Sequence, residues 1–402
     1  MTTTVPVLKY RIESIDILRG LVMLIMAIDH SRDLFHMGTP EPTDLAITTP
    51  FFFFTRWITH FCAPAFVFLS GVSAYLAGMR RTENQLGIFL IKRGLWLLVV
   101  ELVLITLAIT ANPLYNVLIL QVIWAIGGSM ILLGLLIMLR VPLKAIGIIG
   151  AIIFVGHNLL DLETVKSALG SVTGTVAWRM LFSAAGFNAV VQMDSNHFVL
   201  IAYALIPWTG VMFVGYAFGS LYKSTVDAAK RKKTLLYSGL GLLALFFVFR
   251  YFNIYGDPAP WSPQKTTALS IISFFNVSKY PCSLLYLGMT IGTSLVILSQ
   301  IENIKNKFTS IMIVYGNVPF FYYLCHWYLL RIITIIVFFA SGYKANQIVT
   351  PQSPFLFAPK GFGFNLLGVY VVWFIVIVIL YLPCKWFAKY KKTHQQWWLS
   401  YL

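Results

Sequence analysis

The chain has 402 residues, of which 58% are hydrophobic and only 11% are charged. Soluble domains average roughly 45–50% apolar and about 25% charged residues, so this composition excludes a water-soluble globular fold. A helix needs about 20 apolar residues to cross the hydrocarbon core of a bilayer, and apolar segments of that length recur along the chain. We therefore expect an all-α, polytopic membrane protein.

Apolar segments in chain order predict a bundle of about ten transmembrane helices. They cover residues 15–37, 57–79, 88–110, 116–139, 143–160, 198–221, 234–253, 281–299, 310–340 and 364–388. The ninth segment contains Pro319, and because proline breaks the hydrogen-bond ladder of a helix, two readings stay open. It forms either one span or a short interfacial helix followed by a span. We expect one domain over residues 1–402, with its helical core at about 11–390, and no cleavable signal peptide.

The basic residues indicate which side of the membrane each loop faces. The net charge is +16, and Lys and Arg concentrate in alternate connections. Examples are residues 80–93, 223–233 and 385–392. This alternation is the positive-inside pattern, and with ten spans it places both termini in the cytoplasm. A bacterial-type cytoplasmic membrane and no nucleic-acid partner are expected, although basic residues at the inner face could also attract an anionic substrate.

Cysteines and long loops give weaker signals. The cysteines show no metal-ligand spacing and are interpreted as small packing residues: Cys62, Cys282, Cys325 and Cys384. The loops at residues 161–197 and 254–280 are longer than is usual between helices. They are either functional loops on the outer side or simple connectors.

Three histidines are expected in one layer of the outer half of the membrane. Helical rise places His30 roughly 22 Å up the first span and His326 roughly 27 Å up the ninth. His60 lies near the outer end of the second span, which descends. Ionisable side chains inside spans usually face a cavity or a partner. His60 and His326 are therefore candidate substrate-binding residues, although a metal site built from the three is not expected.

Two carboxylates flank the first of these histidines. Asp29 is adjacent to His30, and Asp33 lies three residues further along the same helix face. A carboxylate beside an imidazole can fix its tautomer and raise its basicity, which suits a general base. A hydrogen-bonded cluster at a helix end is the structural alternative.

Further polar residues are candidates at other depths. Asp16 and Arg19 can pair on one helix face, either as a structural pair or in contact with a cytoplasmic anion. Glu101 lies near mid-bilayer and needs a partner, for which Arg19 is one candidate. Gln121 and Trp124 either line a cavity or pack between helices.

Several segments resemble one family of membrane acetyltransferases. Residues 11–20 read RIESIDILRG, and the similarity runs on in order to about residue 331. The segments that carry it are residues 11–33, 59–71, 206–219, 279–287 and 315–326. Together they resemble the bacterial branch of the heparan-alpha-glucosaminide N-acetyltransferase catalytic-domain family, within the wider transmembrane acyltransferases.

The resemblance implies transfer of an acetyl group from cytoplasmic acetyl-CoA to a sugar amine or hydroxyl on the far side, inside the helical bundle. In the lysosomal member a functional Asn lies ten residues after the Arg–Gly pair, where this chain has His30. The wider acyltransferases have a functional His near that point. The catalytic His of the lysosomal member lies further on, and His36 is the nearest histidine here.

These observations lead to one hypothesis and two rivals. We expect His30, oriented by Asp29 or Asp33, to deprotonate a saccharide acceptor, which attacks the thioester directly or through an acyl-histidine. Arg19, Arg80 and Arg93 are the candidate ligands of the CoA phosphates. The rivals are a transporter or flippase of a polar saccharide precursor and a non-enzymatic membrane partner protein. Acetyl-CoA is the expected co-substrate, no metal is expected, and an oligomer is compatible with the sequence.

Overall fold

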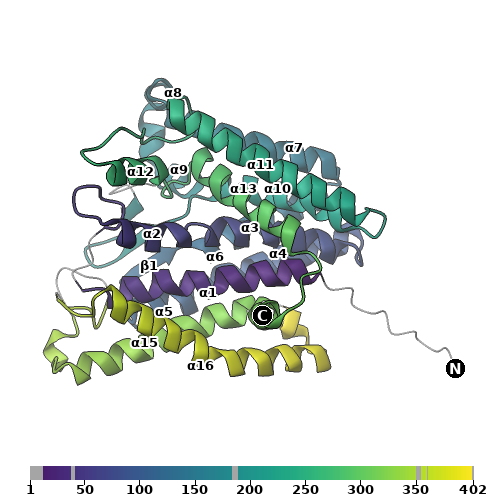
Figure 1. Cartoon of the computed structure of the whole chain (residues 1–402). Helices are drawn as coiled ribbons and strands as arrows, with labels where there is room; N and C mark the ends of the chain where they lie inside the picture. The colour runs from purple at the N-terminus through teal and green to yellow at the C-terminus, as the bar shows by residue number, and fades with distance from the viewer. Residues whose placement is uncertain (1–11, 38–40, 183–188, 350–354, 360, 401–402) are drawn as a thin grey trace.

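The computed structural model describes residues 12–37, 41–182, 189–349, 355–359 and 361–400. Long helices lie side by side across the whole width of the molecule (Figure 1). In the described part, seven helical segments are long and apolar enough to span a membrane. They are Pro50–Gly78, Leu143–Asp161, Leu205–Tyr222, Ala228–Phe252, Leu284–Ile301, Pro319–Ala340 and Leu366–Thr393. The chain is therefore a multi-pass membrane protein, while the expected number of about ten spans stays a prediction.

The elements follow one another in this order. The first half contains α1 (Glu13–Phe35), α2 (Pro50–Thr59), α3 (Cys62–Gly78), α4 (Glu83–Val100), the π-helical turn η1 (Glu101–Ile105), α5 (Thr106–Thr110), β1 (Val117–Leu120), α6 (Val122–Met138), α7 (Leu143–Gly156), α8 (Glu163–Leu169), α9 (Val176–Leu181), β2 (Val190–Gln192) and β3 (Phe198–Ile201). The second half contains α10 (Leu205–Gly219), α11 (Ala228–Phe252), α12 (Thr267–Phe275), α13 (Leu284–Ile301), α14 (Lys307–Gly316), α15 (Pro319–Ala340) and α16 (Leu366–Thr393).

The structure corrects the expected all-α fold at one place. The segments expected to be helical from residues 116 and 198 begin as strands β1 and β3, which pair in parallel, and β2 pairs with β3 in the antiparallel sense. A run of four apolar residues is too short for periodicity to distinguish a strand from the start of a helix. The fold is thus mostly helical with one small three-stranded sheet.

Two expected spans are each broken into two helices. The segment at residues 57–79 contains the end of α2 and all of α3, with the break at His60 and Phe61. The segment at residues 310–340 is α14 followed by α15, because Pro319 starts a new helix. The alternative of two helices in the ninth segment is therefore the observed one.

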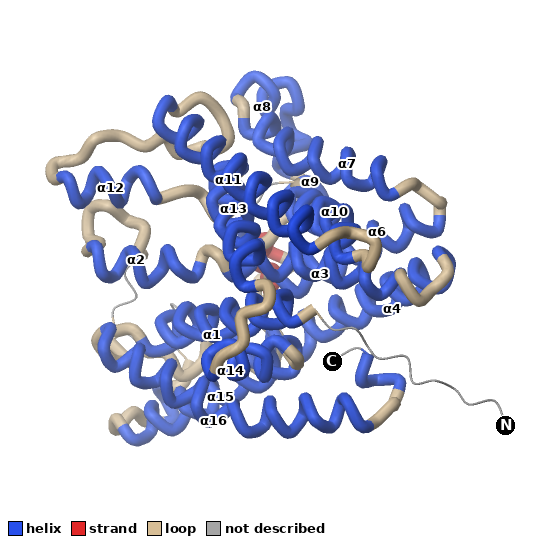
Figure 2. Tube along the Cα trace, turned by 45° about the vertical axis from the view of Figure 1, so that its right-hand side comes forward, coloured by secondary structure: helices blue, strands red, loops and turns tan. Residues whose placement is uncertain are grey.

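Helix α1 lies in the middle of the bundle. It packs against α14, α15 and α16 on one side and contacts α2, α3 and α13 on the other (Figure 1). Figure 2 shows α14, α15 and α16 grouped next to α1, apart from α7, α10 and α11. Asp16, Asp29 and Arg32 of α1 are consequently buried in protein, whereas Glu13 and Asp33 are exposed.

Small residues allow α1 and α14 to approach closely. A Cβ atom on Gly20 would lie 1.9 Å from the carbonyl oxygen of Met312, and one on Gly316 would lie 1.8 Å from the carbonyl oxygen of Asp16. Membrane helices lack a hydrophobic driving force for association and rely on such close contacts. The same reciprocal arrangement joins α3 to α10, through Gly71 and the carbonyl oxygen of Met212 at 2.1 Å.

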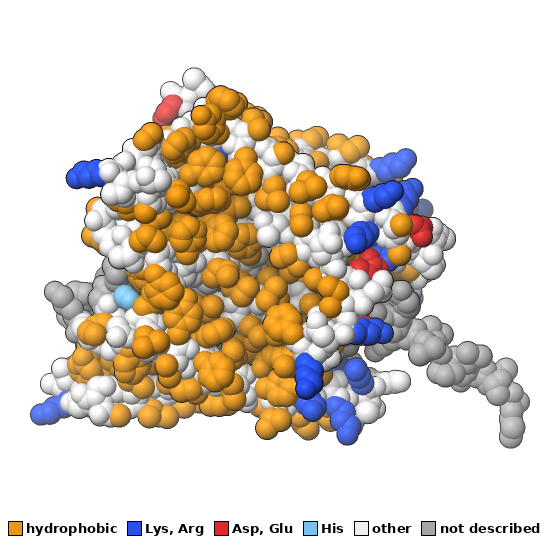
Figure 3. All heavy atoms as spheres, in the orientation of Figure 1, with side chains coloured by type: hydrophobic (Ala, Val, Ile, Leu, Met, Phe, Trp, Pro, Cys, Tyr) orange, Lys and Arg blue, Asp and Glu red, His pale blue; other side chains and the backbone are white. Residues whose placement is uncertain are grey.

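The surface agrees with a membrane environment. Apolar side chains cover most of the face seen in Figure 3, and Lys and Arg gather at the edge where α1 begins and α16 ends. This polarity is what the positive-inside pattern predicts. The side of the membrane on which each terminus lies remains a prediction, and residues 1–11 are outside the described part.

The contact between α1 and α14 should not tolerate a methyl group. We expect Gly316→Ala to destabilise the protein by on the order of 1–3 kcal/mol, because backbone atoms would have to move. Gly241→Ala is the matched control, since a Cβ there meets no atom within 4 Å. Thermal unfolding in detergent measures both variants. Equal melting temperatures for Gly316→Ala and wild type would contradict the close approach.

Candidate active site

Three adjoining cavities lie along α1. The first, of about 360 Å³, lies at the carboxyl end of α1, and we call it the His30 cavity. The second, of about 100 Å³, is an apolar neck lined by Met23, Ile126 and other residues. The third, of about 770 Å³, lies at the amino end of α1, and we call it the basic cavity. Phe66 lines all three, so the cavities adjoin inside the bundle.

His30 lines the His30 cavity and contacts a second histidine, His326, behind the cavity wall. Nδ1 of His30, on α1, lies 2.7 Å from Nε2 of His326, on α15. Nδ1 of His326 lies 3.2 Å from the carbonyl oxygen of Tyr322, one turn earlier in the same helix. The His30 ring stacks on Trp327 with centroids 4.0 Å apart. His30 is half-buried and lines the cavity, whereas His326 is fully buried behind it.

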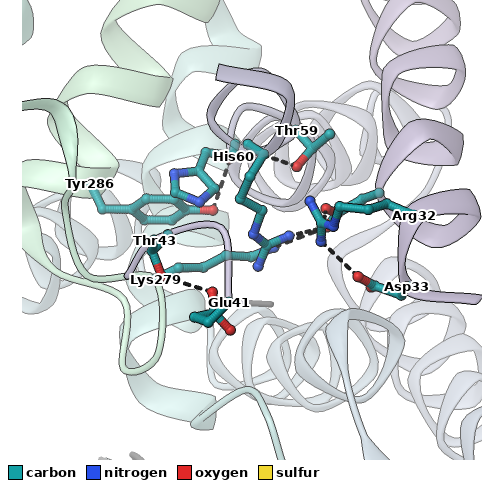
Figure 4. A network of polar contacts seen from close by, with 10 residues as sticks. Arg32, Asp33, Glu41, Thr43, Thr59, His60, Lys279 and Tyr286 are labelled. Atoms are coloured by element: carbon teal, nitrogen blue, oxygen red, sulfur yellow. Dashed lines mark hydrogen bonds and ion pairs between the residues drawn. The ribbon is translucent and has the colours of Figure 1, made fainter. Parts of the chain in front are cut away.

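A buried ion network lies beside the histidine pair. Asp29 pairs with Arg32 at 2.7 Å and with Arg56 from α2, and Nζ of Lys279 lies 4.0 Å from the Asp29 carboxylate. Arg32 also pairs with Asp33 at 2.6 Å. Figure 4 shows Lys279 extending from one side of this network toward Arg32 on the other. Asp29 and Asp33, the expected carboxylate partners of His30, therefore form ion pairs with arginines. Nδ1 of His30 forms its hydrogen bond with His326 instead.

The buried carboxylate of Glu101 caps a helix. One oxygen of Glu101, in the π-helical turn η1, accepts the backbone N–H of Gln121 at 2.6 Å. Gln121 is the residue before α6, which has no side-chain cap of its own. A carboxylate at a helix N-terminus accepts hydrogen bonds from backbone N–H groups that lack a partner within the helix. Its negative charge also interacts favourably with the positive end of the helix dipole. Glu101 thus holds the start of α6, where Gln121 lines the His30 cavity.

The basic cavity holds one of the expected ion pairs. Arg19 pairs with Asp16 at 3.3 Å and also donates to the hydroxyl of Ser73 on α3. Arg93 lines both the basic cavity and the neck. Lys391 and Lys392, from the end of α16, complete the charged wall. Four cationic side chains against Glu13 and Asp16 make this wall positive.

Some expected site residues lie elsewhere. His60 is buried at the break between α2 and α3, where its carbonyl oxygen accepts the hydroxyl of Tyr286 (Figure 4), and it is not among the residues lining the cavities. Trp124 packs in the first turn of α6 without lining the three cavities. Arg80 is exposed in the turn after α3, outside the basic cavity. His36 does line the His30 cavity, with its ring tilted by 30° against that of Phe52 at a centroid distance of 4.8 Å.

Several site residues were not expected from the sequence. Arg32 lies three residues after Asp29, and on a helix that spacing alone indicates an ion pair. Lys279 belongs to one of the segments that carry the family resemblance. Arg56 and Trp327 carry no comparable signal, because only the tertiary fold brings them to α1.

The site has no grouping typical of a metal centre. In the described residues, no three His, Cys, Asp or Glu side chains lie together as metal ligands would. The polar groups of the site are instead a histidine pair and a network of oppositely charged side chains.

Fold and site together define a multi-pass membrane protein with a polar cavity at each end of a charged central helix. The family described as heparan-alpha-glucosaminide N-acetyltransferase, catalytic, matches residues 11–249. The chain belongs to this family, and it is therefore a membrane acetyltransferase by family. A search of curated proteins finds no match. Lys279 and His326 lie after the matched residues, so the site extends beyond them.

The ion network predicts a strong coupling between Asp29 and Arg56. Removing Arg56 leaves the buried Asp29 carboxylate with Arg32 and the more distant Lys279, so we expect Arg56→Met to destabilise the protein by on the order of 1–3 kcal/mol. Asp29→Asn in the same protein should recover part of that loss, with non-additivity of about 0.5–3 kcal/mol. Chemical denaturation of the two single variants and the double variant in detergent measures this. Strict additivity would show that the two side chains do not interact.

Proposed function

We propose that this protein moves an acetyl group from acetyl-CoA in the basic cavity to an amine or hydroxyl of a sugar in the His30 cavity. The observation that carries the proposal is the row of three adjoining cavities, basic at one end and lined by His30 and aromatic rings at the other. Membership of the acetyltransferase family supports the acetyl donor. The basic end would face the cytoplasm of a bacterial-type cell, and the His30 end would face outward.

The donor matches the basic cavity in charge. CoA carries phosphate groups, for which Arg and Lys are the usual protein partners. Arg19, Arg93, Lys391 and Lys392 would hold these phosphates, and Arg80 would not take part because of its exposed position. The apolar neck would take the uncharged pantetheine arm and bring the thioester toward His30.

The acceptor fits the His30 cavity by its mixture of rings and polar groups. Tyr203, Tyr323 and Trp327 offer aromatic faces, and Lys279 and Gln121 offer polar contacts. Small-molecule sites commonly combine apolar walls with a few placed polar groups. A saccharide with apolar ring faces and many hydroxyls matches this lining.

In the proposed reaction His30 is the general base. The acceptor nitrogen or oxygen attacks the thioester carbon while its proton passes to His30, a new C–N or C–O bond forms and the C–S bond breaks. The proton on His30 then passes to the CoA thiolate, which leaves as the thiol. Such proton transfer contributes about 10²–10⁴-fold to the rate. An acyl-histidine on His30 is the competing route, and it would give ping-pong kinetics.

A carrier of a polar saccharide is the second candidate, because a row of cavities through a bundle also suits transport. The two candidates differ in one observable property. A carrier moves its substrate without breaking a thioester, whereas an acetyltransferase consumes acetyl-CoA.

Thioester cleavage by purified protein in nanodiscs tests the proposal. With radiolabelled acetyl-CoA and glucosamine-type acceptors, we expect label transfer by wild type and a loss of about 10²–10⁴-fold in His30→Ala. His197→Ala is the control, since this exposed histidine pairs with Asp194 and lines none of the three cavities. Saccharide transport by wild type without thioester cleavage would replace the acetyltransferase by the carrier.

A further inference from the structure

We propose that His326 is a positioning residue that fixes the tautomer of His30, so that Nε2 of His30 is the nitrogen that receives the acceptor's proton. The inference rests on the proposed function for its kinetic consequence. Its structural core, the location of two protons, can be measured without turnover. His326 lies beyond the residues that match the family.

The first step concerns the proton on His326. Its Nδ1 lies 3.2 Å from the carbonyl oxygen of Tyr322. A carbonyl oxygen only accepts hydrogen bonds, so Nδ1 of His326 must carry the hydrogen. In the neutral ring, Nε2 then has a free lone pair and can only accept.

The second step concerns the proton on His30. The 2.7 Å contact between Nδ1 of His30 and Nε2 of His326 has room for one hydrogen between the two nitrogens. Since Nε2 of neutral His326 accepts, Nδ1 of neutral His30 must donate. His30 is then the tautomer with a hydrogen on Nδ1 and a lone pair on Nε2.

The third step places that lone pair. His30 lines the cavity, its Nδ1 is held by His326, and one ring face is covered by Trp327 at 4.0 Å. Nε2 is the ring nitrogen left for a substrate. His326 is fully buried and does not line the cavity, so it acts on the reaction only through His30.

The arrangement replaces the carboxylate that usually orients a catalytic histidine. Asp29 and Asp33 are held by Arg32, with Arg56 also on Asp29, and neither makes the contact that His326 makes. When His30 takes the acceptor's proton on Nε2, the proton on Nδ1 already points at the lone pair of His326. The positive charge can therefore spread over two rings before the proton leaves for the thiolate.

Substitutions at His326 test whether its side chain acts as a hydrogen-bond acceptor or only fills space. Glutamine offers a side-chain oxygen that can accept from Nδ1–H of His30, whereas leucine fills the space without accepting. We expect kcat to fall on the order of 10²-fold or more in His326→Leu and about tenfold or less in His326→Gln, with KM for acetyl-CoA nearly unchanged in both. Cys325→Ala, the neighbouring position on α15, is the control and should match wild type.

A spectroscopic measurement decides the tautomer directly. Nitrogen-15 NMR of histidine-labelled protein, with His30→Gln to assign the signal, distinguishes a hydrogen on Nδ1 from one on Nε2. We expect the Nδ1–H form of His30 in wild type and in His326→Gln, and loss of that preference in His326→Leu. An Nε2–H form in wild type, or wild-type kcat in a folded His326→Leu, overturns the inference. An inactive wild type with the expected tautomer would instead count against the proposed function alone.

Discussion

A charged side chain that is buried away from water is costly unless oppositely charged partners meet it, and helix α1, which is packed among other helices, carries such side chains near both ends. Asp16 and Arg19 meet each other beside the basic cavity. Asp29 meets Arg32 on α1 and Arg56 on α2. The helices that supply these partners pack around α1. Polar side chains near the two ends of α1 line two cavities, and an apolar neck separates them.

The proposed chemistry depends on helices that are distant from α1 in the sequence. The break between α14 and α15 lets Gly316 sit against the backbone of α1, while Pro319 starts the helix that carries His326 and also lines the neck. Lys279 reaches the ion network from the connection before α13. The site is therefore assembled by packing around α1, and both Lys279 and His326 lie after residues 11–249, which match the family.

The sequence predicted those features that depend on local pattern. Apolar length predicted membrane helices, and helical rise predicted that His30 and His326 share a depth, which their 2.7 Å contact now fits. The sequence did not predict side-chain contacts between helices. Arg56 on α2 pairs with Asp29 only because of the way α1 and α2 cross. The sequence places Arg80 and Lys391 alike in basic segments next to helix ends. It therefore could not predict that Lys391 lines the basic cavity and Arg80 does not. Strand β1 could be distinguished from a helix only through its pairing with β3, which is distant in the sequence.

The central claim is that acetyl-CoA reaches through the neck from the basic cavity and gives its acetyl group to an acceptor beside His30. A cryo-EM structure with a non-hydrolysable thioether analogue of acetyl-CoA tests it most directly. We expect the nucleotide between Arg93 and Lys392 and the pantetheine arm in the neck. The thioether carbon should lie near His30, with space for an acceptor between them at about 3–3.5 Å from each reacting atom. An analogue bound with its arm outside the neck, pointing to lipid or solvent, would contradict the account.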